Sequence, residues 1–105
     1  MYELNKEKIR EILRQEQVKP VSIESMIKHY PSLPDELGKL VETWMATRLV
    51  PDLVIDGISI HDVMRVRECH FLVAMREMRK LLDPNLTAEE RAQWRRILTT
   101  PIHFE

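Results

Sequence analysis

The fold of this chain is decided by residues 59–82, which read SIHDVMRVRECHFLVAMREMRKLL. This segment carries the longest uninterrupted helical pattern in the sequence. With residues placed 100° apart, an arc of about 120° collects the following apolar side chains: Ile60, Val63, Met64, Phe71, Ala74, Met75, Met78, Leu81 and Leu82. Midway along the segment, Cys69, Leu72 and Val73 make the opposite side apolar too. We therefore predict one central helix over 59–82 that is buried on all sides in its middle turns.

Six prolines divide the chain into intervals that each have room for one element. They stand at Pro20, Pro31, Pro34, Pro51, Pro84 and Pro101. Capping residues and apolar spacing within these intervals predict four further helices. Their approximate ranges are 6–17, 22–30, 34–48 and 87–98.

Two of these helices have a distinct starting signal. Thr87 and Glu90 have the spacing of a capping box, in which each side chain accepts a hydrogen bond from the backbone of the other residue. At the start of the second helix, Ser22 is the expected cap, and Val21 is expected to pack across it onto Met26. Both signals predict sharp helix starts.

Residues 49–58 are the least helical part of the chain. The apolar run Leu53 to Ile55 favours extended structure, and Asp56 and Gly57 form a typical turn pair. We expect at most one very short hairpin near residues 53–60. A helix cap at Ser59 competes with it, because that cap would start the central helix at once.

The composition is that of a globular chain. It has 105 residues, of which 44% are hydrophobic and 31% are charged, and a chain of this length buries about two-thirds of its unfolded surface. We expect an all-α fold, a small orthogonal or irregular bundle of about five helices around residues 59–82, in a single domain over 1–105. The expected core includes Leu37, Leu40, Trp44, Phe71, Met75 and Trp94.

The net charge and the cysteine content bear on the possible partners and on the cellular compartment. The formal net charge is −1, so neither a basic nor an acidic partner is implied by the total. The lone Cys69 excludes an internal disulfide and is expected to be a small buried apolar side chain, which indicates a reducing compartment. No apolar run approaches the length of a membrane span, and the first residues have no apolar signal region. We expect a cytoplasmic protein that does not associate with membranes.

Arg67 is the most unusual residue of the sequence. It falls in the centre of the apolar arc, with Glu68 and His70 on its two flanks. Because burying an unpaired charge is costly, we expect its guanidinium to pair with a carboxylate of another segment, such as Glu36 or Glu42. The alternative is that these three residues hold an anion or a small ligand.

No catalytic or metal-binding pattern emerges. Cys69 and His70 are adjacent and diverge by about 100° on a helix, so they neither chelate one metal nor form a nucleophile and base pair. Glycines at only Gly38 and Gly57 exclude a phosphate-binding loop. We expect no metal, no cofactor and no enzymatic activity.

A basic strip offers a nucleic-acid hypothesis. It comprises Arg65, Arg76, Arg79 and Lys80, with Arg91, Arg95 and Arg96 of the last helix as candidates to extend it. The two helices expected at 22–30 and 34–48 also have the lengths of a helix-turn-helix, but the second opens with acidic residues. A small DNA-binding regulator is therefore an alternative function.

The favoured hypothesis is a non-enzymatic helical module for protein interaction. The central helix has two apolar sides, and the first two helices offer few side chains to cover them. Apolar surface left open on a monomer marks an interface, and two-fold dimers are the commonest closed assembly. We expect a homodimer, or a complex with another protein, with contacts at Leu72, Val73 and Phe104.

Overall fold

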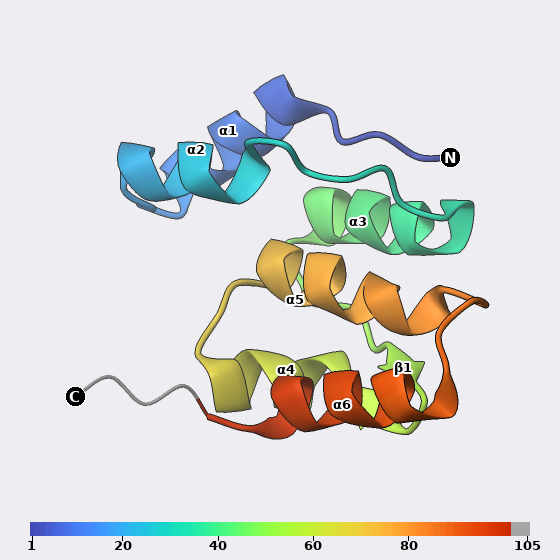
Figure 1. Ribbon diagram of the computed structural model, residues 1–105. Coiled ribbons are helices and arrows are strands. Elements are labelled where there is room, and N and C mark those ends of the chain that lie inside the picture. Colours follow the sequence, from blue (N-terminus) through green and yellow to red (C-terminus); the bar gives the residue numbers. More distant parts are fainter. Residues whose placement is uncertain (102–105) are drawn as a thin grey trace. The chain divides into compact units, whose positions relative to one another are not determined.

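A computed structural model describes residues 1–101 of the chain. The chain divides into two compact units, Met1–Pro51 and Asp52–Glu105, called here the N-terminal and the C-terminal unit. Both consist mainly of helices, and one two-stranded sheet occurs among the described residues (Figure 1). The expectation of a mostly helical chain is confirmed, and that of a single domain stays a prediction.

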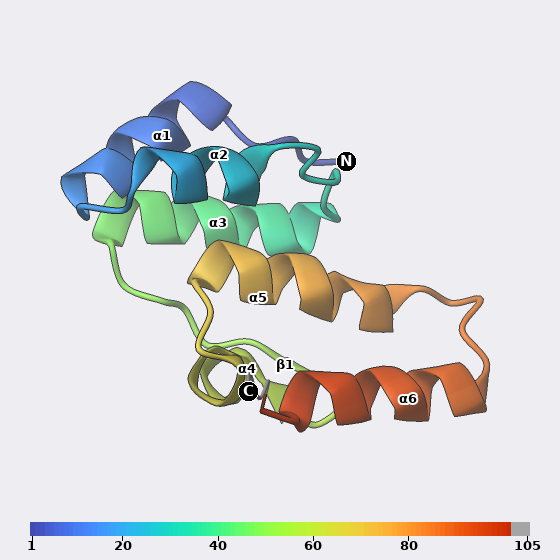
Figure 2. The same ribbon diagram turned by 60° about the vertical axis from the view of Figure 1, so that its left-hand side comes forward.

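Three helices build the N-terminal unit. They are α1 (Lys6–Gln15), α2 (Pro20–Ile27) and α3 (Asp35–Thr47). Helices α1 and α2 pack against each other, and Figure 2 shows both lying along α3. Apolar side chains from all three helices and one connection are buried: Ile9, Ile12, Leu13, Ile23, Ile27, Leu33, Leu37, Val41, Trp44 and Met45. The 3.6-residue spacing read from the sequence therefore marks the buried faces.

The segment before α1 is fastened to α3. Tyr2 and Leu33 form an antiparallel bridge, with N–H to carbonyl distances of 2.7 and 2.8 Å. The Tyr2 ring lies against Gly38, where a Cβ atom would come within 2.4 Å of the ring carbon Cγ, and the Tyr2 hydroxyl donates to Glu42 Oε1 at 2.5 Å. Glycine in the middle of a helix weakens it, so Gly38 is explained by this close approach.

A hairpin opens the C-terminal unit. Strands β1 (Val54–Ile55) and β2 (Ile58–Ser59) pair antiparallel, with Ile55 opposite Ile58. Asp56 and Gly57 between them both have positive φ, 51° and 77°, as a tight two-residue turn requires. The hairpin and the Ser59 cap do not compete as expected. Ser59 ends β2 and also caps the next helix, its hydroxyl accepting from His61 N–H at 3.2 Å.

The predicted single helix over 59–82 is wrong. The segment forms α4 (Ile60–Arg67), α5 (Phe71–Met78) and the 3-10 helix η1 (Arg79–Leu82). The break lies at residues 68–70, called here the hinge. Glu68 has left-handed dihedral angles (φ 50°, ψ 50°), and the N–H of Cys69 donates to the Met64 carbonyl at 3.2 Å. The His70 Nδ1 accepts from Leu72 N–H at 3.1 Å, so local capping at both helix ends replaces the continuous helix.

The last helix, α6 (Ala88–Thr99), packs against α4 and η1. Its capping box is confirmed, because Thr87 Oγ1 accepts from Glu90 N–H at 3.1 Å and Glu90 Oε1 accepts from Thr87 N–H at 3.2 Å. The buried side chains of the C-terminal unit are Ile55, Ile58, Ile60, Val63, Phe71, Leu72, Ala74, Met75, Met78, Leu81 and Leu98.

Four of the six side chains expected in the core are buried: Leu37, Trp44, Phe71 and Met75. Leu40 and Trp94 are half-buried. The Trp94 ring keeps an accessible face on which the Lys80 ammonium lies, 4.0 Å from the ring centroid. A stacked cation thus takes the place of the expected apolar cover. None of the helices in residues 1–101 has the length and apolar character that crossing a bilayer requires.

Candidate functional site

Arg67 lies in the last turn of α4 and is half-buried. Its Nη1 donates to the main-chain carbonyl of Ile97 in α6 at 2.8 Å. Among the described residues its partner is therefore a carbonyl oxygen near a helix C-terminus, where a cation is favoured by the helix dipole, and not the carboxylate expected from the sequence. The contact ties α6 to α4.

The other residues near Arg67 serve the hinge. Glu68 is exposed and supplies the left-handed turn, and His70 is the N-cap of α5. Cys69 is half-buried at this break and not in the middle of a helix, and burial raises the pKa of its thiol. A thiol with a raised pKa is a weak nucleophile. Residues 68–70 instead end one helix and start the next.

Three cations of the basic strip pair with two carboxylates within the C-terminal unit. Arg65 pairs with Asp62 at 3.1 Å, and Glu77 pairs with both Arg76 at 3.3 Å and Lys80 at 3.6 Å. These pairs lower the positive potential that phosphate groups would meet.

Two cations of the basic strip are not members of these ion pairs. The Nε atom of Arg79 is buried and has no hydrogen-bond partner within residues 1–101, while Arg95 is exposed on α6. The strip thus combines paired, part-buried and exposed cations.

Sequence reasoning missed the role of Arg91. Its Nη1 donates to Asp56 Oδ2 and to the Leu81 carbonyl, both at 2.6 Å, and its Nη2 donates to the Asp83 carbonyl at 3.3 Å. One guanidinium therefore joins α6, the hairpin turn and the end of η1. No spacing in the sequence relates Asp56 to a residue 35 positions later.

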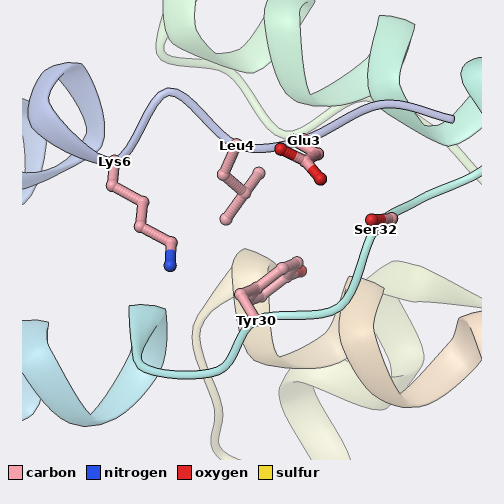
Figure 3. A pocket seen from close by; sticks show the side chains of 5 residues that line it. All are labelled: Glu3, Leu4, Lys6, Tyr30 and Ser32. Atoms are coloured by element: carbon pink, nitrogen blue, oxygen red, sulfur yellow. The ribbon is translucent and has the colours of Figure 1, made fainter.

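Residues 1–101 contain no group of three or more His, Cys, Asp or Glu side chains that could hold a metal ion. The N-terminal unit has an open pocket of about 140 Å³ between the segment before α1 and the α2–α3 connection. Its lining residues are Glu3, Leu4, Lys6, Tyr30 and Ser32 (Figure 3). The wall carries one amine, one carboxylate and two hydroxyls, a set suited to small polar solutes.

The outer face of α2 differs from the other surfaces. Val21 is 75% exposed, and with Ser22, Ser25 and Met26 it lines a shallow depression of about 350 Å³. The expected packing of Val21 across a Ser22 cap is wrong, because α2 begins at Pro20. Proline suits the first helical position, so the helix starts earlier and Val21 turns to solvent.

The predicted interface residues lie in different settings. Leu72 is fully buried in α5 and Val73 is half-buried. Phe104 lies outside the described residues. The expected dimer contact at these three positions stays a prediction, since one chain alone does not test it.

Comparisons of the chain with protein families, with curated proteins and with solved structures found no match.

Proposed function

We propose that this chain is a non-enzymatic helical module for protein interaction, which self-associates through the outer face of α2. The observation that carries the proposal is the absence of charge in the depression on this face. Four neighbouring positions, Val21, Ser22, Ser25 and Met26, bear no charged group, in a chain of which 31% is charged. Depletion of charge and enrichment of methionine are features of interface cores.

A second copy of the chain is the partner that fits this face best. A two-fold contact places the same patch on both sides, so the patch must be compatible with itself. An uncharged face meets that condition, because self-pairing brings no like charges together. The small side chains of Ser22 and Ser25 also leave room for a facing helix to approach, with Val21 and Met26 as apolar anchors.

The two alternatives have weaker support. A nucleic-acid site on the basic strip would use Arg65, Arg76, Arg79, Lys80 and Arg95. Three of these cations, Arg65, Arg76 and Lys80, already meet carboxylates. An anion site at Arg67 would compete with the hydrogen bond of its guanidinium to Ile97. Salt-dependent binding of random duplex DNA would favour the first alternative over self-association.

The test is the solution mass of matched variants by light scattering. Val21→Glu places a charge in the centre of the proposed interface, and we expect it to abolish a dimer that the unmodified protein forms at high micromolar concentration. Leu49→Glu is the control, since Leu49 is 72% exposed in the same unit but lies outside α2. A protein that stays monomeric, or a dimer that both variants retain, contradicts the proposal.

A further inference from the structure

The hinge between α4 and α5 differs in composition from the other connections between α-helices in the described chain. Residues 68–70 read ECH and contain neither proline nor glycine. Each of the other connections contains a proline or is followed at once by one. These prolines are Pro20, Pro31, Pro34, Pro51 and Pro84. Proline prevents two helices from fusing, because it has no N–H to donate and clashes with the preceding turn. Only the hinge lacks this obstacle.

The hinge also holds a residue in a strained conformation. Glu68 has φ 50°, a region in which side chains with a Cβ atom are disfavoured and glycine is not. The apolar side chains before and after the hinge would share one arc of a continuous helix, from Ile60 to Leu82, with the charged Arg67 in the centre of that arc. The side chains on either side are therefore arranged as a continuous helix would need them.

We propose that the hinge opens into one continuous helix over residues 60–82. Two chains then form a domain-swapped dimer, in which each chain exchanges the segment that follows the hinge. In such a dimer, α5, η1 and α6 of one chain pack against α4 and the hairpin of the other. Short hinges under strain favour exchange of this kind. The partner is a second copy, because only a second copy supplies the same contact surfaces.

Contacts that cross the hinge identify what is exchanged. The Arg67 to Ile97 hydrogen bond joins α4 to α6, and the Arg91 to Asp56 ion pair joins α6 to the hairpin. After exchange each of these forms between two chains with unchanged partners. These two contacts are thus retained and the strain at Glu68 is relieved, whereas the capping hydrogen bond that His70 accepts from Leu72 N–H is lost. The exchange is independent of the proposed α2 interface.

The test compares dimer dissociation constants after refolding at high micromolar concentration. Glu68→Gly removes the strain of the closed hinge and weakens a continuous helix. We expect about a tenfold shift toward the closed form per hinge, and about a hundredfold rise in the dissociation constant of a dimer with two hinges. His70→Ala removes the N-cap of α5 and is expected to shift the equilibrium the other way.

Gln17→Gly is the matched control. Gln17 also has positive φ, 62°, but Pro20 follows it and prevents fusion of α1 with α2. We expect this variant to leave the dissociation constant unchanged. An equal rise with both glycine variants overturns the inference, because relief of strain alone would then account for the effect.

The variants separate this inference from the proposed function. A dimer lost with Val21→Glu and unaffected by Glu68→Gly overturns the exchange and leaves the α2 interface standing. A dimer weakened by Glu68→Gly and indifferent to Val21→Glu supports the exchange and contradicts the α2 interface. Monomers in the unmodified protein and in His70→Ala overturn both.

Discussion

The α1–α2 connection and the α4–α5 hinge have similar backbone conformations, but only the first is predicted from the sequence as a break between helices. Both are short, and both contain a residue with a side chain at positive φ, Gln17 at 62° and Glu68 at 50°. In the first, Pro20 forbids a continuous helix. In the second, capping at Glu68 and His70 separates two apolar faces that would share one arc of a continuous helix, with Arg67 between them. A proline prevents a continuous helix, whereas an N-cap stabilises the broken one by only about 1 kcal/mol.

The largest expected effect lies directly after the hinge. Phe71 is 1% exposed, and Phe71→Ala should lower the free energy of unfolding by about 3–5 kcal/mol, because it leaves a cavity. Leu82→Ala is the control from the same apolar arc, since Leu82 is 41% exposed and should lose no more than about 0.5 kcal/mol. Urea unfolding measures both. Equal losses would contradict the break, because a continuous helix would bury the two residues alike.

The N-terminal unit gives the second prediction. Gly38→Ala should lower the free energy of unfolding by about 1–3 kcal/mol, because the new Cβ would overlap the Tyr2 ring. In a Tyr2→Ala background the same change should stabilise the protein by up to about 1 kcal/mol, as alanine favours a helix. A stabilising Gly38→Ala in the unmodified protein would show that Tyr2 does not lie on α3.

The sequence alone predicts local features of this chain but not its long-range contacts. Prolines, the Asp56 and Gly57 pair and the Thr87 to Glu90 spacing act within a few positions, so they locate helix ends and the turn. The partners of Arg67 and Arg91 lie 30 and 35 positions away, and only the folded chain brings them together. The sequence makes His70 a ligand candidate because it flanks Arg67 on a continuous helix, and its role as an N-cap is not predicted because histidine is not among the preferred N-cap residues. Val21 was misplaced by a two-residue error in a helix start.

The N-caps of α5 and α6 should have similar strength. His70→Ala and Thr87→Ala should each lower the free energy of unfolding of the monomer by about 1 kcal/mol. His70→Asp should retain the capping part of the stability, since aspartate is a good N-cap and can accept from Leu72 N–H as His70 Nδ1 does. Denaturant unfolding at low protein concentration excludes association. A loss with His70→Asp as large as with His70→Ala would assign His70 another role.

The smallest expected effect concerns alkaline pH. Burial and the hydrogen bond to Glu42 raise the pKa of Tyr2 above its usual value. The folded chain then holds the phenol proton more tightly than the unfolded chain does. The stability this contributes is present below about pH 10 and is lost as the pH rises beyond it. Tyr2→Phe should therefore flatten the decline of unfolding free energy above pH 10, and an unchanged slope would contradict the Tyr2 to Glu42 contact.

The most direct measurement of the hinge is the sign of the stability change in Glu68→Gly, determined by denaturant unfolding of the monomer. In the broken helix Glu68 occupies a left-handed conformation that glycine adopts without strain. The account predicts a gain of up to about 1 kcal/mol, similar to that of Gln17→Gly. In a continuous helix over 59–82 the same position would be helical. A loss of about 1 kcal/mol, the usual effect of glycine inside a helix, would contradict the break between α4 and α5.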